Sequence, residues 1–319
     1  MRQGLDAVVI DGIEKLPEVQ RPSKETLLEW IGEVLQGYEY RYEAYRHAVA
    51  DLASFYHRHE VKMMVLKGYA CAQNWPKPEH RPCGDIDIWL FGAYNKADAL
   101  IKEKGIYVDI SHHHHTVFNW EEFTVENHYD FVNIYDYQSS RKLDAIFKRM
   151  GTNDSYSIPL FGEQVYLPSP DLHALFLLRH LVSHFSSTKI SFRQVLDWAF
   201  HVEKYANEIN WEWLTEVLKE YHMIEFFNII NAICVEDLGF ESSIFPYTQF
   251  LPCLKERVLQ DILEPAFTTA EPKVFLTRMF YKYKRWQGNA WKQEMCYGES
   301  RWVAFWRGVW YHLLKPASI

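Results

Sequence analysis

A change in hydrophobic period divides this sequence into two parts. Between residues 63 and 133, apolar side chains occur in short runs and in strict alternation, a pattern typical of strands. After about Pro168, apolar side chains recur every three or four residues, a pattern typical of amphipathic helices. We therefore expect an N-terminal arm over residues 1–22, an α/β domain of the α+β type over 23–167, and an all-helical C-terminal domain over 168–319.

The sequence also predicts where several of these elements lie. A helix should begin after Ser23, a typical N-cap residue, and be interrupted near Gly37. A strand is expected over residues 106–110, and a hairpin over 116–133. In the second part, Asp171 is a candidate N-cap, and helices fit residues 192–205, 211–221 and 224–238.

The first expected strand ends at a lysine and a glycine. Residues 63–66 form an apolar run that stops at Lys67-Gly68, and residues 69–75 fit a short helix that ends before Pro76. Such a turn directs free backbone N–H groups and an ammonium group to one place, where a triphosphate can bind. A Lys-Gly turn after a strand is also common without any ligand, so this motif alone is not specific.

Two aspartates stand on the polar face of the next expected strand. Alternation over residues 85–90 puts apolar side chains on one face and Asp85 and Asp87 on the other. Paired carboxylates are ligands that Mg²⁺ prefers, but aspartates are also common on the solvated face of a sheet. A two-metal site usually has a third carboxylate, for which Glu126, on the same face of a later strand as His128, is our candidate.

The order of these motifs resembles a known family. Leu66-Lys67-Gly68, then Arg81, then Gly84-Asp85-Ile86-Asp87-Ile88 are similar to the LKG turn and R..GDID strand of the uncharacterised nucleotidyltransferases in the DNA polymerase beta-like superfamily. Residues 125–128 are similar to the VE.H strand of this family. The resemblance covers about residues 45 to 205. Its helical pattern is matched by Pro168, Asp171, His180, His184, Arg193 and Asp197.

This resemblance implies a minimal nucleotidyltransferase fold, with a mixed sheet and flanking helices. It also implies that Asp85, Asp87 and Glu126 are catalytic and hold two Mg²⁺ or Mn²⁺ ions, and that Lys67 and Gly68 face the triphosphate of an NTP. The reaction would transfer a nucleoside monophosphate to an acceptor hydroxyl or phosphate and release pyrophosphate. The superfamily's usual Gly-Ser turn is Lys-Gly here, so the serine hydroxyl is missing. The other implied nucleotide-binding residues are Arg81, Gly84, His128, His180, His184, Arg193 and Asp197.

Two histidine patterns have alternative interpretations. A strand over His112–His115 would present two rings on each face, and we interpret it as a partly exposed strand; a transition-metal site and a contact to the nucleotide are the alternatives. His180 and His184 stand one helical turn apart, as two zinc ligands would, but without the glutamate of a metalloprotease motif. They are either core histidines or part of the nucleotide cleft, together with Arg193 and Asp197.

Composition and missing motifs exclude several classes of protein. A net charge of −8 argues against bulk electrostatic binding to nucleic acid, and no apolar run approaches the roughly 18 residues of a membrane span. Five scattered cysteines without a Cys-x-x-Cys motif indicate reduced thiols, so we expect a cytoplasmic protein. The sequence also contains no Walker loop, Gly-x-Ser-x-Gly motif or Gly-x-Gly-x-x-Gly motif.

Two hypotheses compete with an active nucleotidyltransferase of this general kind. The first is a catalytically degenerate nucleotide-binding or protein-interaction module, such as an antitoxin or a scaffold. The second is a toxin-like nucleotidyltransferase that modifies tRNA, supported by basic and aromatic residues between Lys273 and Lys315. The simpler interpretation of that segment is a set of amphipathic helices whose aromatic side chains pack on the preceding domain. The sequence leaves the acceptor open among a small molecule, a protein and an RNA.

Overall fold

Two compact units make up the part of the chain that the structure describes. The structure is a computed structural model, and it describes residues 3–13, 15–135, 137–247, 250–267, 272 and 274–314. The first unit contains the chain up to His173 and from Tyr311 onward, and the second contains Ala174–Trp310. All strands found among the described residues belong to the first unit.

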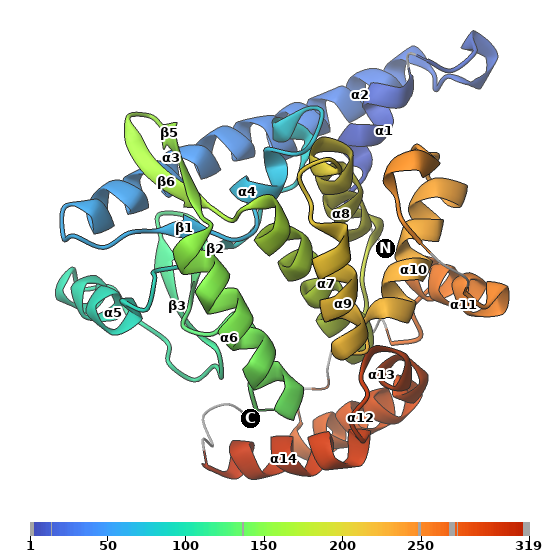
Figure 1. Ribbon diagram of the computed structural model, residues 1–319. Coiled ribbons are helices and arrows are strands. Elements are labelled where there is room, and N and C mark those ends of the chain that lie inside the picture. Colours follow the sequence, from blue (N-terminus) through green and yellow to red (C-terminus); the bar gives the residue numbers. More distant parts are fainter. Residues whose placement is uncertain are drawn as a thin grey trace. The chain divides into compact units, whose positions relative to one another are not determined.

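A mixed six-stranded sheet forms the framework of the first unit (Figure 1). The strand order is β3-β4-β2-β1-β6-β5. The sheet is mixed because β2 is parallel to β4 and β1 is parallel to β6, whereas the remaining neighbours are antiparallel. This confirms the predicted fold class. The strands are β1 (Met64–Val65), β2 (Ile86–Trp89), β3 (His115–Trp120), β4 (Phe123–His128), β5 (Tyr156–Leu160) and β6 (Glu163–Leu167).

Six helices accompany the sheet in the described part of the first unit. The Ser23 side chain caps α2 by accepting a hydrogen bond from the backbone N–H of Thr26, as the sequence predicts. Instead of a break near Gly37, a π-helical turn over Leu35–Glu39 joins α2 to α3. Short 3₁₀ turns lie at Glu18–Gln20 and Pro78–His80. The helices are α1 (Asp6–Ile13), α2 (Lys24–Val34), α3 (Tyr40–His57), α4 (Tyr69–Ala72), α5 (Tyr94–Glu103) and α6 (Gln138–Asn153).

The apolar side chains of β2 and β4 fix the direction in which the polar ones point. Ile86, Ile88 and Val125 are fully buried, in the same core as Tyr45 and Leu52 of α3. Burying an aliphatic side chain of this size contributes about 1.5–3 kcal/mol. A shift of either strand by one residue would exchange these side chains for carboxylates, so the core strongly selects the register. The opposite face of β2 and β4 is therefore left to the polar residues.

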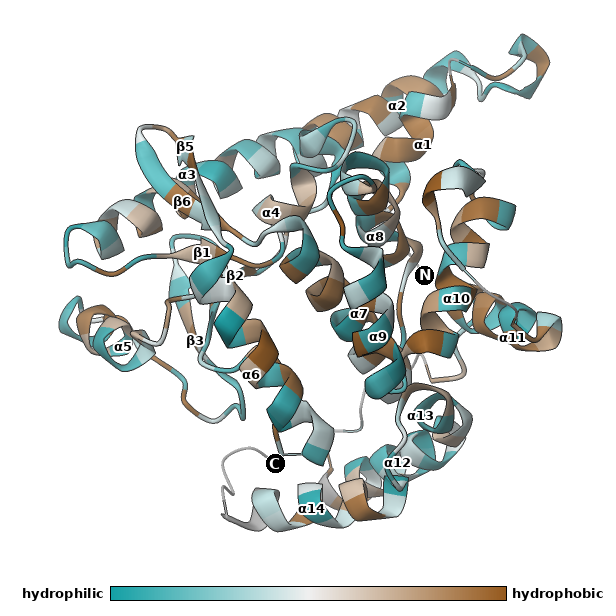
Figure 2. Ribbon diagram, viewed as in Figure 1, coloured by the Kyte–Doolittle hydropathy of each residue, from teal (hydrophilic) through white to brown (hydrophobic). Residues whose placement is uncertain are grey.

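Helices build the whole of the second unit in the residues that the structure describes. Its centre contains Trp198, whose indole N–H donates to the side chain of Asn231 at 2.7 Å. Hydrophobic residues lie along α7 and α10 (Figure 2), and many side chains of these two helices are buried. A π-helical turn over Ile233–Asp237 follows α10, and a 3₁₀ turn lies at Ser242–Ile244. The helices are α7 (Pro170–Ser187), which begins at the end of the first unit, α8 (Phe192–Tyr205), α9 (Trp211–Glu220), α10 (Ile224–Ala232), α11 (Pro252–Leu263), α12 (Phe275–Gly288), α13 (Ala290–Cys296) and α14 (Arg301–Leu314).

Two local predictions were wrong. Residues 106–110 form no strand and contribute only an isolated bridge between Asp109 and Val117, because apolar side chains of this segment, such as Tyr107, face solvent instead of a core. The N-cap of α7 is Ser169 instead of Asp171: its hydroxyl accepts a hydrogen bond from the Leu172 N–H at 3.3 Å, and the helix begins at the following proline.

The expected basic and aromatic segment corresponds to α12, α13 and α14, whereas its limits, Lys273 and Lys315, lie outside the described residues. Trp286 packs against Trp302 and Phe305, with ring centroids 4.8 Å apart in both pairs. Trp306 is nevertheless 64% exposed. The aromatic face is thus only partly packed, which differs from the simpler interpretation given above.

Candidate functional site

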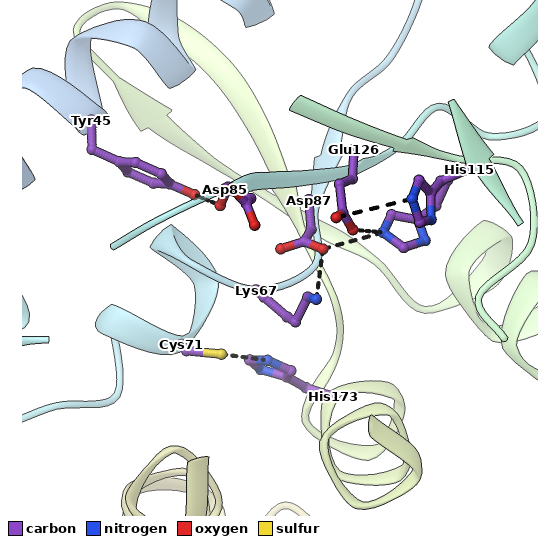
Figure 3. Close-up of polar contacts among 9 residues, drawn as sticks. Tyr45, Lys67, Cys71, Asp85, Asp87, His115, Glu126 and His173 are labelled. Atoms are coloured by element: carbon purple, nitrogen blue, oxygen red, sulfur yellow. Dashed lines mark hydrogen bonds and ion pairs between the residues drawn. The ribbon is translucent and has the colours of Figure 1, made fainter. Parts of the chain in front are cut away.

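Two parallel strands place acidic side chains next to each other on the polar face of the sheet. The register of β2 and β4 pairs Asp87 with Glu126, and the two side chains point the same way (Figure 3). His128 follows two residues after Glu126 on β4, and therefore lies on the same face. One potential ligand atom from each of these three residues lies within 4.8 Å of the other two. Asp85 directly precedes β2, is exposed, and extends its carboxylate toward the same region. The structure therefore places Asp85 at the outer edge of a group formed by Asp87, Glu126 and His128.

Opposite charges meet in the buried part of this face. The ammonium group of Lys67 lies 2.6 Å from Oδ1 of Asp87. Burial alone would raise the pKa of Asp87, but Lys67 and His128 together hold it well below its ordinary value. Burial alone would lower the pKa of Lys67, but the carboxylates of Asp87 and Glu126 raise it. Both Lys67 and Asp87 therefore stay charged at neutral pH.

His128 connects the two carboxylates of the group. Its Nε2 lies 3.2 Å from Oδ1 of Asp87 and 3.4 Å from Oε2 of Glu126. Burial lowers the pKa of His128, but the two carboxylates more than offset this and raise it. For Glu126, burial raises the pKa, but the hydrogen bond to His128 brings it below its ordinary value. At Asp85, by contrast, partial burial and then the nearby Glu126 and Asp87 charges raise the pKa.

Tyr45 is a site residue that the sequence interpretation missed. Its hydroxyl donates a hydrogen bond to the backbone carbonyl of Asp85 at 3.0 Å, so α3 holds the start of β2 in place (Figure 3). Tyr45 also packs against Gly68, whose φ is +54°: a Cβ on this glycine would lie 2.0 Å from the tyrosine hydroxyl. The sequence showed Tyr45 only as one apolar position of a helix, because nothing in a helical period reveals a hydroxyl that reaches another strand.

We expect the substitution Tyr45→Phe to lower the free energy of unfolding by about 1 kcal/mol, because it leaves the Asp85 carbonyl without this donor. Thermal unfolding and amide hydrogen exchange of β2 would measure the effect. Tyr56→Phe is the matched control, since Tyr56 is buried on the same helix and its hydroxyl has no hydrogen-bond partner among the described residues. Equal losses of stability in the two variants would show that the hydroxyl of Tyr45 contributes nothing specific.

The histidine run adopts a different structure from the predicted one. Only His115 belongs to β3, so the expected strand over residues 112–115, with two rings on each face, was wrong. The chain turns before β3, and this brings His114 and His115 together next to His128, with one ring nitrogen of each within 4.8 Å of the others. Burial and the neighbouring imidazoles lower the pKa of His115 to about 4 and that of His114 well below its ordinary value. Both rings are therefore neutral at pH 7.

The remaining candidates in the first unit have mainly structural contacts. Arg81 is buried, and its guanidinium group donates to the carbonyl of Pro82 at 3.2 Å, within the segment that leads to β2. Gly84 is exposed directly before Asp85. Sequence interpretation also missed Arg41, which donates to the Cys83 carbonyl at 3.1 Å and lowers the pKa of Asp85 against the effects that raise it.

The other four nucleotide-binding candidates lie in the second unit. His180 and His184 lie one turn apart on α7, and their rings meet edge to face with centroids 4.3 Å apart. Arg193 and Asp197 both belong to α8, where Asp197 is buried. Their part in nucleotide binding stays a prediction.

Comparison with models of protein families gives a match over most of the chain. The family model described as "Uncharacterised nucleotidyltransferase" matches residues 1–239. The chain belongs to this family. The match includes the whole six-stranded sheet and the first helices of the second unit, and the family as such implies an NTP and a divalent metal in general.

The chain was also compared with solved structures and with curated proteins. Among solved structures, an antigenic nucleotidyltransferase-like protein from Paracoccidioides brasiliensis is similar at 14% identity and a TM-score of 0.40, over 65% of this chain and 94% of that chain. A search of the curated proteins gave no match. Among the described residues, no helix has the length and apolar character needed to cross a membrane.

Proposed function

We propose that this chain transfers a nucleoside monophosphate from an NTP to a hydroxyl or phosphate group of an acceptor, and releases pyrophosphate. The observation that carries the proposal is the pairing of Asp87 with Glu126 in the parallel register of β2 and β4. This register puts two carboxylates on one face, with Asp85 at the edge and Lys67 in contact. Family membership supports the reaction class.

The donor set fits a divalent cation such as Mg²⁺ or Mn²⁺. Asp85, Asp87 and Glu126 would hold it, because carboxylate oxygens are the ligands that hard cations prefer. When bound, such a metal neutralises phosphate charge and stabilises the leaving pyrophosphate. Two of the three carboxylates are kept ionised by their neighbours, since Lys67 and His128 lower the pKa of Asp87 and His128 lowers that of Glu126.

Lys67 would act as the positive group beside the triphosphate. The expected helix after it is only α4, which has four residues, so its dipole adds little to phosphate binding. The ammonium charge therefore has to supply most of the attraction on this side of the site, which is consistent with a lysine in a turn that lacks the superfamily's serine. Gly68 keeps the turn free of a side chain between Lys67 and Tyr45.

Binding and turnover should be tested separately on the full-length chain. Calorimetric titration with each of the four NTPs in the presence of Mg²⁺ measures binding, and release of pyrophosphate measures transfer. Pyrophosphate should be followed with metabolite extract, protein extract and total tRNA as acceptors, because these arms distinguish the three classes of acceptor. We expect Mg²⁺-dependent NTP binding and pyrophosphate release in at least one arm.

Each other outcome of these two assays has a defined meaning. Absence of Mg²⁺-dependent NTP binding contradicts the proposal as a whole. NTP binding without pyrophosphate release in any arm supports the degenerate nucleotide-binding module instead. Release only with tRNA supports the toxin-like alternative.

A further inference from the structure

We propose that His114, His115 and His128 form a second metal site, which binds a transition-metal ion such as Zn²⁺ through three imidazole nitrogens. This inference goes beyond the proposed transfer reaction and does not depend on it. The three residues come from the turn before β3, from the first position of β3 and from the last position of β4. Because His115 is the register partner of His128, the β3–β4 hairpin itself brings them together.

The geometry is close to that of a three-histidine site. One nitrogen of each ring lies within 4.8 Å of the other two. A tetrahedral ion with metal–nitrogen bonds of about 2.0–2.1 Å holds its ligand atoms about 3.3–3.4 Å apart, so small side-chain rotations suffice to close the site. Three protein ligands would leave one position open for water or another molecule, as in catalytic zinc sites.

Unpaired nitrogen atoms point to a missing ligand. The Nδ1 atoms of His114, His115 and His128 are all buried, and none of them has a hydrogen-bond partner among the described residues. Buried polar atoms are nearly always paired, so three unpaired nitrogens in one cluster are unusual. An ion at this place would satisfy lone pairs that the protein leaves open.

His128 is already oriented as metal-bound histidines usually are. Its Nε2 contacts the carboxylates of Asp87 and Glu126, which leaves Nδ1 as the nitrogen available to a metal. A carboxylate that holds the second ring nitrogen of a ligand histidine fixes its orientation and makes it a stronger donor. An ion on Nδ1 would replace the proton that a charged His128 carries there, and that proton would be released to solvent.

Ligand chemistry separates this site from the carboxylate site. Imidazole nitrogen suits Zn²⁺, Cu²⁺, Fe²⁺ and Ni²⁺, whereas Mg²⁺ prefers oxygen. The two sites share the neighbourhood of His128, so an ion on its Nδ1 would place positive charge near Asp87 and Glu126. We therefore expect the nitrogen site to be selective against Mg²⁺ while it lies directly beside the place where Mg²⁺ would act.

Cobalt provides a spectroscopic test on the full-length chain after treatment with a chelator. We expect one equivalent of Co²⁺ to bind with the visible absorption of a tetrahedral ion and to be displaced by Zn²⁺ but not by excess Mg²⁺. The double variant H114Q/H115Q should lose about 100-fold or more in Co²⁺ affinity. H113Q is the matched control from the same run, because His113 lies outside the cluster, and it should bind as the wild type does.

Several outcomes would overturn the proposal. Failure of the wild type to bind Co²⁺, unchanged affinity in H114Q/H115Q, or displacement by Mg²⁺ would each do so. If the double variant does not fold, Cu²⁺ bound to the wild type provides the answer, since nitrogen hyperfine splitting in its electron paramagnetic resonance spectrum must show three imidazole ligands. The variant D85N should keep Co²⁺ binding even though it removes a carboxylate of the proposed Mg²⁺ site, so failure of one site does not imply failure of the other.

Discussion

Replacement of Asp85 by asparagine should reduce nucleotidyl transfer by roughly 100- to 1000-fold, because it removes a charge that would hold the divalent cation at the reacting phosphates. Pyrophosphate release, with whichever acceptor class supports release by the wild type, measures this effect. The melting temperature should stay close to that of the wild type, because Asp85 is exposed at the edge of the site.

Glu122→Gln is the matched control for Asp85→Asn. It removes an exposed carboxylate from the turn of the β3–β4 hairpin, in the same sheet. This variant should keep full turnover. If Asp85→Asn also keeps full turnover, Asp85 has no catalytic role, and the proposed metal site is reduced to Asp87 and Glu126.

A test of Asp87 requires a different choice of variants, because this side chain also stabilises the fold. Asp87 is buried and contacts the Lys67 ammonium at 2.6 Å, so its removal leaves this largely buried ammonium without its nearest counterion. Breaking a buried pair in this way costs about 3–5 kcal/mol. The double variant K67M/D87N removes both charges, and we expect it to unfold at a higher temperature than D87N.

A second large effect on stability is expected from Gly68→Ala. The new Cβ would lie 2.0 Å from the hydroxyl of Tyr45, which is fully buried and cannot move away, and the residue would keep a φ of +54°. Backbone strain and overpacking each cost about 1–3 kcal/mol, so we expect a loss of roughly 2–6 kcal/mol in the free energy of unfolding. Chemical denaturation measures this loss, and NTP binding should weaken with it, because β1, the turn and the start of β2 meet at this contact.

Two further variants separate strain from collision. Gly92→Ala also introduces a side chain at positive φ, +88°, but nothing lies within 4 Å of the new Cβ, so it measures backbone strain alone. Y45F/G68A removes the hydroxyl that the new Cβ would meet, although a ring carbon still lies 2.8 Å away, so the rescue should be partial. If Gly68→Ala costs no more than Gly92→Ala, the contact with Tyr45 is not tight.

The parts of the site that the sequence predicted are those carried by local alternation. Strict alternation over residues 85–90 and around Glu126 and His128 was sufficient to predict which side chains share a polar face. The neighbour relation between β2 and β4 was not visible in the sequence, because parallel pairing depends on a crossover of many residues and on the burial of Ile86, Ile88 and Val125. Glu126 was proposed because a two-metal site usually needs a third carboxylate, the family resemblance agreed with that choice, and the sheet places β4 beside β2.

Two further parts of the first unit were missed, the β5–β6 hairpin and α6. The hairpin gives a weak signal because β5 is largely exposed. The signal for α6 was present but not used: Leu143, Phe147 and Met150 recur at helical spacing and are buried on one face. The turn of that hairpin needs positive φ at both Phe161 and Gly162, which sequence reveals only at the glycine. His114 and His115 were assigned to opposite faces for a related reason: a strand period was applied to a segment that turns.

The parallel register between β2 and β4 makes the spacing of Asp87 and Glu126 independent of the chain that connects them. Residues 104–108, between the end of α5 and the bridge at Asp109, can lengthen or shorten without moving either carboxylate, provided that the strands keep their apolar faces. Tyr107, which is 81% exposed in this connection, marks a place where a reporter group or an inserted peptide could be attached without disturbing the core. Related chains could therefore differ in the length and sequence of this connection, and thus in the substrates they accept, while they keep the same carboxylates.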